Sequence, residues 1–152
     1  MKPVKQFRSR KEEMEMKLGV FTVLFAQKSF EEMLDYVKQS GLDAVEIGTS
    51  GYPGTDHCPI DELLEDEGKR NQYLDAVTSR GLTISAFSCH GNPVSPDTTL
   101  AKDSDEALRK SIKLAQLMGV PVVNTFSGTP GADEDAKHPN WPVAPWPNEY
   151  GD

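Results

Sequence analysis

The chain has 152 residues, of which 26% are charged and 37% hydrophobic, and its formal net charge is −8. This length allows one domain with a sizeable core, and two cysteines are too few for a disulfide-stapled mini-protein. An acidic chain repels phosphate backbones, and no apolar run approaches the roughly 18 residues of a membrane span. We therefore expect neither a nucleic-acid partner nor a membrane contact.

The first eleven residues carry five basic side chains, but no apolar segment of the kind found in a signal peptide follows them. We therefore expect residues 1–15 to be a basic, disordered extension. The two cysteines favour a reducing compartment, so we expect a cytoplasmic protein.

One pattern recurs three times along the chain: a helical segment, a glycine, and then an apolar, β-branched run. The glycines are Gly41, Gly81 and Gly119, spaced by about 40 residues, which is the length of one strand–loop–helix unit. The repeat predicts an alternation of strands and helices.

The first helix is expected to begin at Ser29, because Ser29 and Glu32 have the spacing of a capping box. Its apolar stripe recurs with helical periodicity at Phe30, Met33, Leu34 and Val37. A second helical segment covers residues 61–80 with a break at Gly68, and a third covers residues 103–118.

Four strands are expected at residues 18–25, 44–48, 83–88 and 120–126. They are nearly continuous apolar runs, which is typical of parallel strands buried on both faces. The predicted order is therefore strand, helix, strand, helix, strand, helix, strand.

Residues 129–152 contain five prolines and both tryptophans and show no periodicity, so we expect a loop or lid here. No glycine-rich phosphate loop follows the first strand, which disfavours a doubly wound sheet. The sequence therefore predicts an α/β fold in which residues 16–128 form a partial (β/α)8 TIM barrel. It would contain the first three and a half βα units, with a parallel sheet and helices on one side.

Several stretches together carry a family resemblance. They are GYPGTDHCP at 51–59, DELLEDE at 61–67, ISAFSCHGNP at 84–93, VNTFSG at 123–128 and WPVAPWP at 141–147. From about residue 16 to its C-terminus the chain resembles the sugar phosphate isomerase/epimerase family, which has the xylose isomerase-like TIM-barrel fold.

The resemblance implies a ketose or sugar-phosphate substrate and proton transfer next to a carbonyl, usually with a divalent metal such as Mn, Mg, Zn or Co. In that family the metal ligands come largely from the second half of the barrel. The resemblance therefore implies an N-terminal half that binds no metal and is inactive alone. A non-catalytic half-barrel that binds a partner or self-associates through open sheet edges remains an alternative. An abasic-site endonuclease of the same superfamily is disfavoured by the acidic charge.

The site candidates lie where the predicted strands end, because barrel active sites form at that face. Glu46 is a charged residue inside an apolar strand and is the candidate catalytic group. Two roles remain open for it: an acceptor for a sugar hydroxyl, or a structural carboxylate bonded to a neighbouring strand. His90 is likewise either a substrate contact or a loop histidine that caps a carbonyl.

The substrate-binding candidates share a position after the third or fourth strand and are His90, Asn92, Asn124, Ser127, Trp141 and Trp146. Adjacent pairs such as His57 and Cys58, or Cys89 and His90, lack the spacing of a zinc site. We therefore predict no metal site in this chain.

Overall fold

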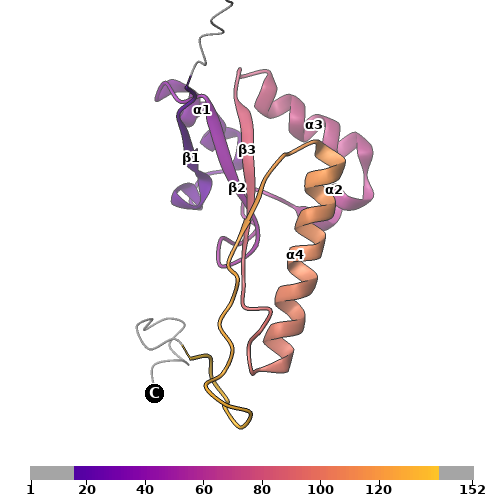
Figure 1. The fold of residues 1–152 in the computed structure, drawn as a ribbon. Coiled ribbons are helices and arrows are strands. Elements are labelled where there is room, and N and C mark those ends of the chain that lie inside the picture. Colours follow the sequence, from indigo (N-terminus) through magenta and orange to yellow (C-terminus); the bar gives the residue numbers. More distant parts are fainter. Residues whose placement is uncertain (1–15, 141–152) are drawn as a thin grey trace, which may run out of the picture.

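The computed structural model describes residues 16–140, which form one parallel four-stranded sheet in the order β1-β2-β3-β4 (Figure 1). The strands are β1 (Gly19–Phe21), β2 (Ala44–Gly51), β3 (Thr83–His90) and β4 (Val123–Thr125). The predicted α/β fold, with strands adjacent in chain order, is confirmed. Residues 1–15, Trp141 and Trp146 lie outside the described residues.

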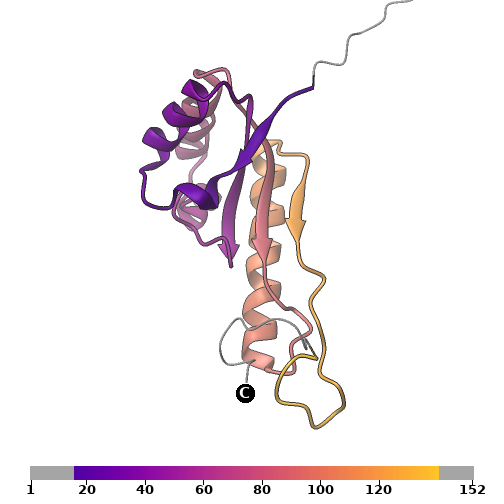
Figure 2. The same cartoon turned by 90° about the vertical axis from the view of Figure 1, so that its left-hand side faces the viewer.

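The helices lie together on one side of the sheet, as Figures 1 and 2 show from two directions. They are the 3-10 helix η1 (Thr22–Phe25), α1 (Phe30–Gln39), α2 (Ile60–Glu65), α3 (Glu67–Thr78) and α4 (Thr98–Met118). This arrangement agrees with the right-handed crossovers expected between parallel strands. Across residues 16–140, no helix has the length and apolar character that crossing a bilayer requires.

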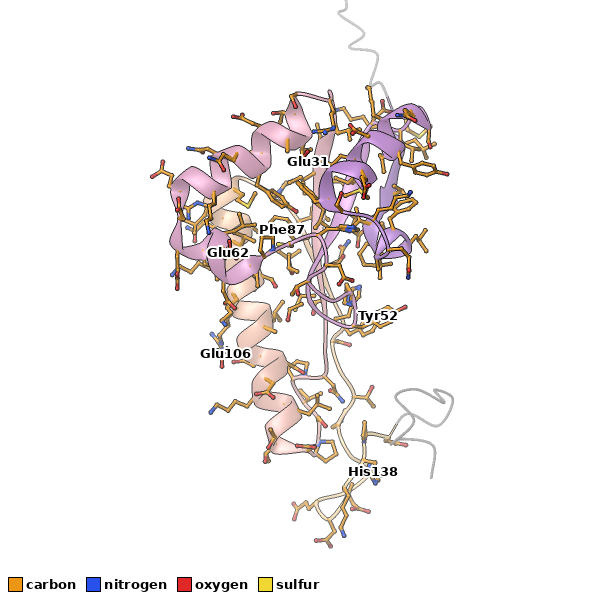
Figure 3. The ribbon with its side chains drawn as sticks, turned by 180° about the vertical axis from the view of Figure 1, so that it is seen from behind. Glu31, Tyr52, Glu62, Phe87, Glu106 and His138 are labelled. Carbon is orange, nitrogen blue, oxygen red and sulfur yellow. The ribbon has the colours of Figure 1, made fainter. Side chains whose placement is uncertain are left out.

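The hydrophobic core fills the layer between the sheet and these helices. Phe87 of β3 is fully buried there, and Figure 3 shows it behind the helices that cover the sheet. Val45 and Ile47 of β2 are also fully buried, as are Leu34 of α1 and Leu114 of α4. Burying a side chain of this size contributes about 1.5–3 kcal/mol, so this layer holds the helices on one face.

The helix ends follow the signals in the sequence. The Ser29 side chain accepts a hydrogen bond from the Glu32 N–H, and Glu32 bonds back to the Ser29 N–H, which confirms the capping box. Gly119 ends α4 with φ = 68°, a left-handed conformation that glycine adopts at little cost.

The outer strands are shorter than expected. Residues 22–25 of the first predicted strand form η1 instead, because a short apolar run does not distinguish a strand from a helical turn. The fourth strand was expected over residues 120–126 but begins at Val123. Pro121 has no N–H to donate to a sheet, and pairing starts when the Phe87 N–H bonds to the Val122 carbonyl. The two central strands run longer than expected, to Gly51 and His90.

Two helix boundaries also differ from the prediction. The 61–80 segment is two helices that meet at Asp66, whose side chain accepts a bond from the Lys69 N–H; the break is not at Gly68. The last helix begins at Thr98, because the Asp97 carboxylate caps it by accepting from Thr99 and Leu100. Side-chain caps therefore set both boundaries.

Candidate functional site

Glu46 points to the sheet face that the helices leave open. Successive strand residues point to opposite faces, and Val45 and Ile47 on either side of Glu46 belong to the helix-facing core. Glu46 is only partly buried and lies on the inner face, which is the interior side of a barrel. Its carboxylate is therefore directed toward the region where a barrel enzyme binds its substrate.

Two side chains from the neighbouring strands donate hydrogen bonds to Oε1 of Glu46. One is the Ser88 hydroxyl from β3, and the other is the Asn124 amide from β4, whose Nδ2 lies 3.0 Å away. A hydrogen bond to a serine on a neighbouring strand is the contact that a structural role for Glu46 predicts. The Glu46 carboxylate nevertheless lies on the inner face, where a substrate contact is also expected. The structure thus joins Glu46 to Asn124 and adds Ser88, which the sequence analysis did not single out. Its position two residues before His90 was the available signal, since such residues share a face.

His90 ends β3 between two aromatic rings. Its imidazole stacks on Phe126 at a centroid distance of 4.2 Å and meets Phe21 edge-on at 6.4 Å. Its Nδ1 is buried and has no hydrogen-bond partner among the described residues. Burial lowers the pKa of His90, and the nearby charge of Glu46 opposes this shift only in part. A pKa below its ordinary value favours the neutral ring at pH 7.

The end of β2 is fitted closely against His90. Gly51 has φ = 69°, and a Cβ there would lie 2.1 Å from the His90 carbonyl oxygen. The same oxygen accepts a hydrogen bond of 2.9 Å from the Tyr52 N–H. Gly51 is therefore the residue that lets the backbone of β2 approach and hold the His90 backbone.

Asn92 connects the loop after β3 to the segment after β4. Its Nδ2 donates to the Thr129 carbonyl at 2.9 Å, and its Oδ1 accepts from the Thr129 N–H at 3.0 Å. These bonds explain why the two segments run beside each other in Figures 1 and 2. Both ends of the Asn92 amide are thus engaged within the chain. Ser127, in the same segment, is exposed, and the substrate contacts expected of both residues stay predictions.

The adjacent pair His57 and Cys58 is part of the packing of the loop after β2. His57 is buried, with Nε2 3.0 Å from the Lys28 carbonyl oxygen, and its own carbonyl accepts from the Tyr73 hydroxyl at 2.7 Å. Burial raises the pKa of the Cys58 thiol to about 12. Such a thiol is inert at pH 7, so this pair acts structurally.

An open groove of about 490 Å³ runs along the inner face from the amino ends of the strands to Glu46. Its lining residues are Lys17, Gly19, Val20, Phe21, Ala44, Glu46, Thr83 and Ser85. In a closed barrel, side chains from the other strands fill this interior. Glu46 lies at the end of the groove, opposite Phe21 at the end of β1 and five residues before the end of β2.

The site residues do not form a metal centre by themselves. Within residues 16–140, no three His, Cys, Asp or Glu side chains are grouped closely enough to hold one ion. Glu46 and His90 are two candidate ligands, whereas zinc sites use three or more protein ligands. The described residues therefore do not fit the metal expected from the resemblance, and we assign no chemical step to one.

Comparison with known proteins relates this geometry to a protein family. The family model of the xylose isomerase-like TIM barrel matches residues 34–144. The curated protein YfiH of Bacillus subtilis (strain 168) is 36% identical over 126 residues, which are 83% of this chain and 40% of YfiH. The chain thus spans less than half the length of this relative.

Solved structures share the fold at low sequence identity. A putative xylose isomerase from Rhodospirillum rubrum superposes with a TM-score of 0.58 at 20% identity, over 78% of this chain and 41% of that protein. The probable 3-DHS dehydratase AsbF from Bacillus anthracis gives 0.53 at 20% identity, over 76% and 40%. A D-psicose 3-epimerase crystallised with D-fructose gives 0.50 at 12% identity, over 85% and 40%. These matches establish a shared partial barrel fold.

Proposed function

Because the chain belongs to the xylose isomerase-like TIM barrel family, we propose that it forms one side of a sugar isomerase or epimerase site. The substrate would be a ketose or a sugar-phosphate-like compound bound at the carboxyl ends of β2, β3 and β4. The observation that carries this proposal is the Glu46 carboxylate on the inner face, hydrogen-bonded to Ser88 and Asn124.

The geometry suits recognition of hydroxyl groups next to a carbonyl. Ser88 and Asn124 both bond to Oε1, so they orient the carboxylate and leave Oε2 to accept from a sugar hydroxyl. The His90 ring, which lies close enough to Glu46 for the charge of Glu46 to affect its pKa, is the second candidate contact. Holding a substrate by several such groups fixes its reacting carbon relative to an acid or base supplied elsewhere in the enzyme.

The whole enzyme would move a proton next to the carbonyl, and that step requires more groups than these residues supply. A general acid and a general base must both reach the reacting atoms. Glu46 and His90 are titratable side chains of β2 and β3 that lie close enough for their charges to interact. We therefore propose that this chain alone does not catalyse the reaction, and that a divalent metal, if the whole enzyme uses one, is held mainly by other residues.

Sugar binding tests the proposal directly. We expect D-fructose or D-psicose to bind the purified chain, with chemical-shift changes at His90 and Asn124 in an NMR titration. Glu46→Gln should weaken binding by about three- to tenfold, since a hydrogen bond to a charged group contributes about 1.5–3 kcal/mol and a neutral one roughly half. Glu65→Gln, an exposed glutamate on α2, is the matched control and should bind as the parent does. The proposal would be refuted if neither D-fructose nor D-psicose binds.

Catalysis by the chain alone is measured separately. The chain should not exchange substrate C–H protons with D₂O in the presence of Mn²⁺, because its acid–base set is incomplete. Turnover that a chelator abolishes would show that the inactivity proposal is wrong.

Self-association is a second candidate function, favoured by apolar side chains at both lateral edges. Leu18 and Tyr36 are exposed on the β1 side, and Ile112, Leu117 and Val122 on the β4 side. The backbone edges of β1 and β4 are also unpaired in the described sheet. We propose that a second copy of the chain covers these edges. Sedimentation of the parent chain should give the mass of a dimer, and the Leu117→Glu variant should give the mass of a monomer. A monomer mass for the parent chain would refute the proposed self-association.

We further propose that the protein works in carbohydrate metabolism in the cytoplasm. Cys58 and Cys89 are both free and buried, which suits a reducing compartment. Fractionation of cells that express the tagged protein would test the location, and recovery outside the cytoplasm would refute it.

A further inference from the structure

We propose that the described side of this site binds an uncharged, polyhydroxylated part of the substrate and disfavours a phosphate group. This inference rests on the proposed function and narrows it, because it selects an unphosphorylated ketose over its phosphate ester. Three observations carry it: the charges at the strand ends, the occupied backbone amides, and the hydrogen-bonding character of the open groups.

The strand ends offer few positive charges. The loops after β1, β2 and β3, residues 22–29, 52–59 and 91–97, contain one lysine, Lys28, and no arginine. The described segment after β4, residues 126–140, adds one exposed lysine, Lys137, together with Asp133, Glu134 and Asp135. The Lys28 ammonium lies 5.4 Å above the ring of Tyr36, on helix α1, and so is directed toward the helix layer. Glu46 meanwhile directs a carboxylate to the open face. A phosphate group beside Glu46 would therefore meet a like charge.

Backbone amides at the starts of α1 and α4, which could bind phosphate, are already hydrogen-bonded within the chain. Helix N-termini attract phosphate because their first N–H groups lack partners. In α1 the Ser29 and Glu32 N–H groups bond to each other's side chains. In α4 the Asp97 carboxylate accepts from both Thr99 and Leu100 and places a negative charge at the helix start. Both of these termini therefore already bind acceptors of the chain itself. The six-residue helix α2, after β2, has no side-chain cap, but Asp61 and Glu62 place negative charge in its first turn.

The glycine-containing segment after β4 is also engaged. The Thr129 N–H, which follows Gly128, donates to Oδ1 of Asn92. The Asn92 N–H donates in turn to the Ser104 hydroxyl at 3.1 Å. These two amides would be natural contacts for a phosphate oxygen in this loop pair, and neither is available.

The groups that remain open suit hydroxyls. Ionised Glu46 only accepts hydrogen bonds, and phosphate oxygens mainly accept them as well, so the two are mismatched. A sugar hydroxyl both donates and accepts, and it therefore fits the Glu46 carboxylate. Phe126, which is 37% exposed and stacks on His90, adds an apolar ring beside these polar groups. This combination of a carboxylate, a neutral imidazole and an aromatic ring matches a polyol.

The charge on Glu46 sets the size of the expected preference. A dianion and a carboxylate about 8 Å apart in water repel by about 1 kcal/mol, which corresponds to about a fivefold loss of affinity. The other glutamates that Figure 3 labels, Glu31, Glu62 and Glu106, project from the outer surface of the helices. Distance and salt screen the charges of these three glutamates from the site, so Glu46 should account for most of the repulsion of a phosphate group.

The test compares D-fructose with D-fructose 6-phosphate on the purified chain by titration calorimetry. We expect the phosphate ester to bind at least about fivefold more weakly, and inorganic phosphate not to displace D-fructose. Glu46→Gln should bring the dissociation constants of the two ligands closer together. The exposed control Glu65→Gln should leave the ratio of these two constants unchanged.

Each other result has a distinct meaning. Equal or tighter binding of the phosphate ester, or displacement of D-fructose by inorganic phosphate, overturns this inference and leaves the proposed function standing. The inference is also wrong if Glu46→Gln leaves the ratio unchanged. Binding of neither ligand refutes the proposed function, and the inference falls with it.

Discussion

The hydrogen bond from Ser88 to Glu46 can be measured by a double-mutant cycle, because Ser88→Ala removes the donor with almost no change of volume. Ser88 is fully buried, and its hydroxyl bonds to a charged acceptor on the neighbouring strand. Hydrogen bonds to charged groups contribute about 1.5–3 kcal/mol. Because Glu46 is partly open to solvent and keeps its bond from Asn124, we expect a loss near the lower end, about 1–2 kcal/mol in the free energy of unfolding.

The second arm of the cycle is Glu46→Gln, which replaces the charged acceptor with a neutral one. Ser88→Ala should then cost only about half as much, since neutral hydrogen bonds are roughly half as strong. Urea unfolding followed by far-UV circular dichroism gives the four free energies. If Ser88→Ala cost the same in both backgrounds, the serine would not act through Glu46, and the geometry on which the site is built would be wrong.

Three further perturbations test other parts of the structure. Burial holds the pKa of His90 below its ordinary value of 6.5, so the unfolded state binds the proton more readily. The stability that neutral His90 contributes is therefore complete above pH 6.5 and is lost as the pH falls through its folded pKa. The urea midpoint of the parent chain should fall between pH 7.5 and 5.5, and His90→Asn should make that fall smaller. A fall of the same size in both proteins would contradict the pKa argument. Gly51→Ala should destabilise the chain by more than about 1 kcal/mol, because the new methyl group would clash with the His90 carbonyl. The backbone NMR signals of His90 should shift for the same reason. Unchanged His90 signals in the variant would exclude the clash. Leu114→Ala should lower the free energy of unfolding by about 2–5 kcal/mol, since it leaves a cavity between α4 and the sheet, and a loss below 1 kcal/mol in urea titrations would place Leu114 outside the core.

The sequence predicted the fold well because its main signals are local. The apolar stripe and capping box around Ser29 depend on residues within one or two turns, and glycines such as Gly119 mark helix ends by their own conformational freedom. The repeat of about 40 residues then left few arrangements, because parallel strands joined by helices cross over with one hand. Parallel order and helices on one side follow from these rules.

The site was predicted only in part, because its contacts join strands that are far apart in the sequence. The convergence of Glu46 and Asn124 followed from their positions at strand ends, and the 3.0 Å bond between them agrees with it. Ser88 was missed because a small hydroxyl inside an apolar strand is not distinctive, and its position two residues before His90 was not used. It becomes significant only through the parallel register that pairs Glu46 with Ala86 and Ser88 with Asn124.

Asn92 shows how the same sequence pattern can serve a different use. Its position after the third strand, beside His90, led to its prediction as a substrate contact, yet its amide forms two hydrogen bonds with Thr129. An asparagine amide carries one acceptor and one donor group side by side, which is the arrangement that a backbone N–H and C=O present to each other in a sheet. Asn92 therefore acts as a short extension of the sheet beyond β3 and β4, and it holds the segment after β4 beside the site. A loop held in this way keeps Phe126 stacked on His90, so hydrogen bonds of Asn92 within the chain help to determine the shape of the surface around the site.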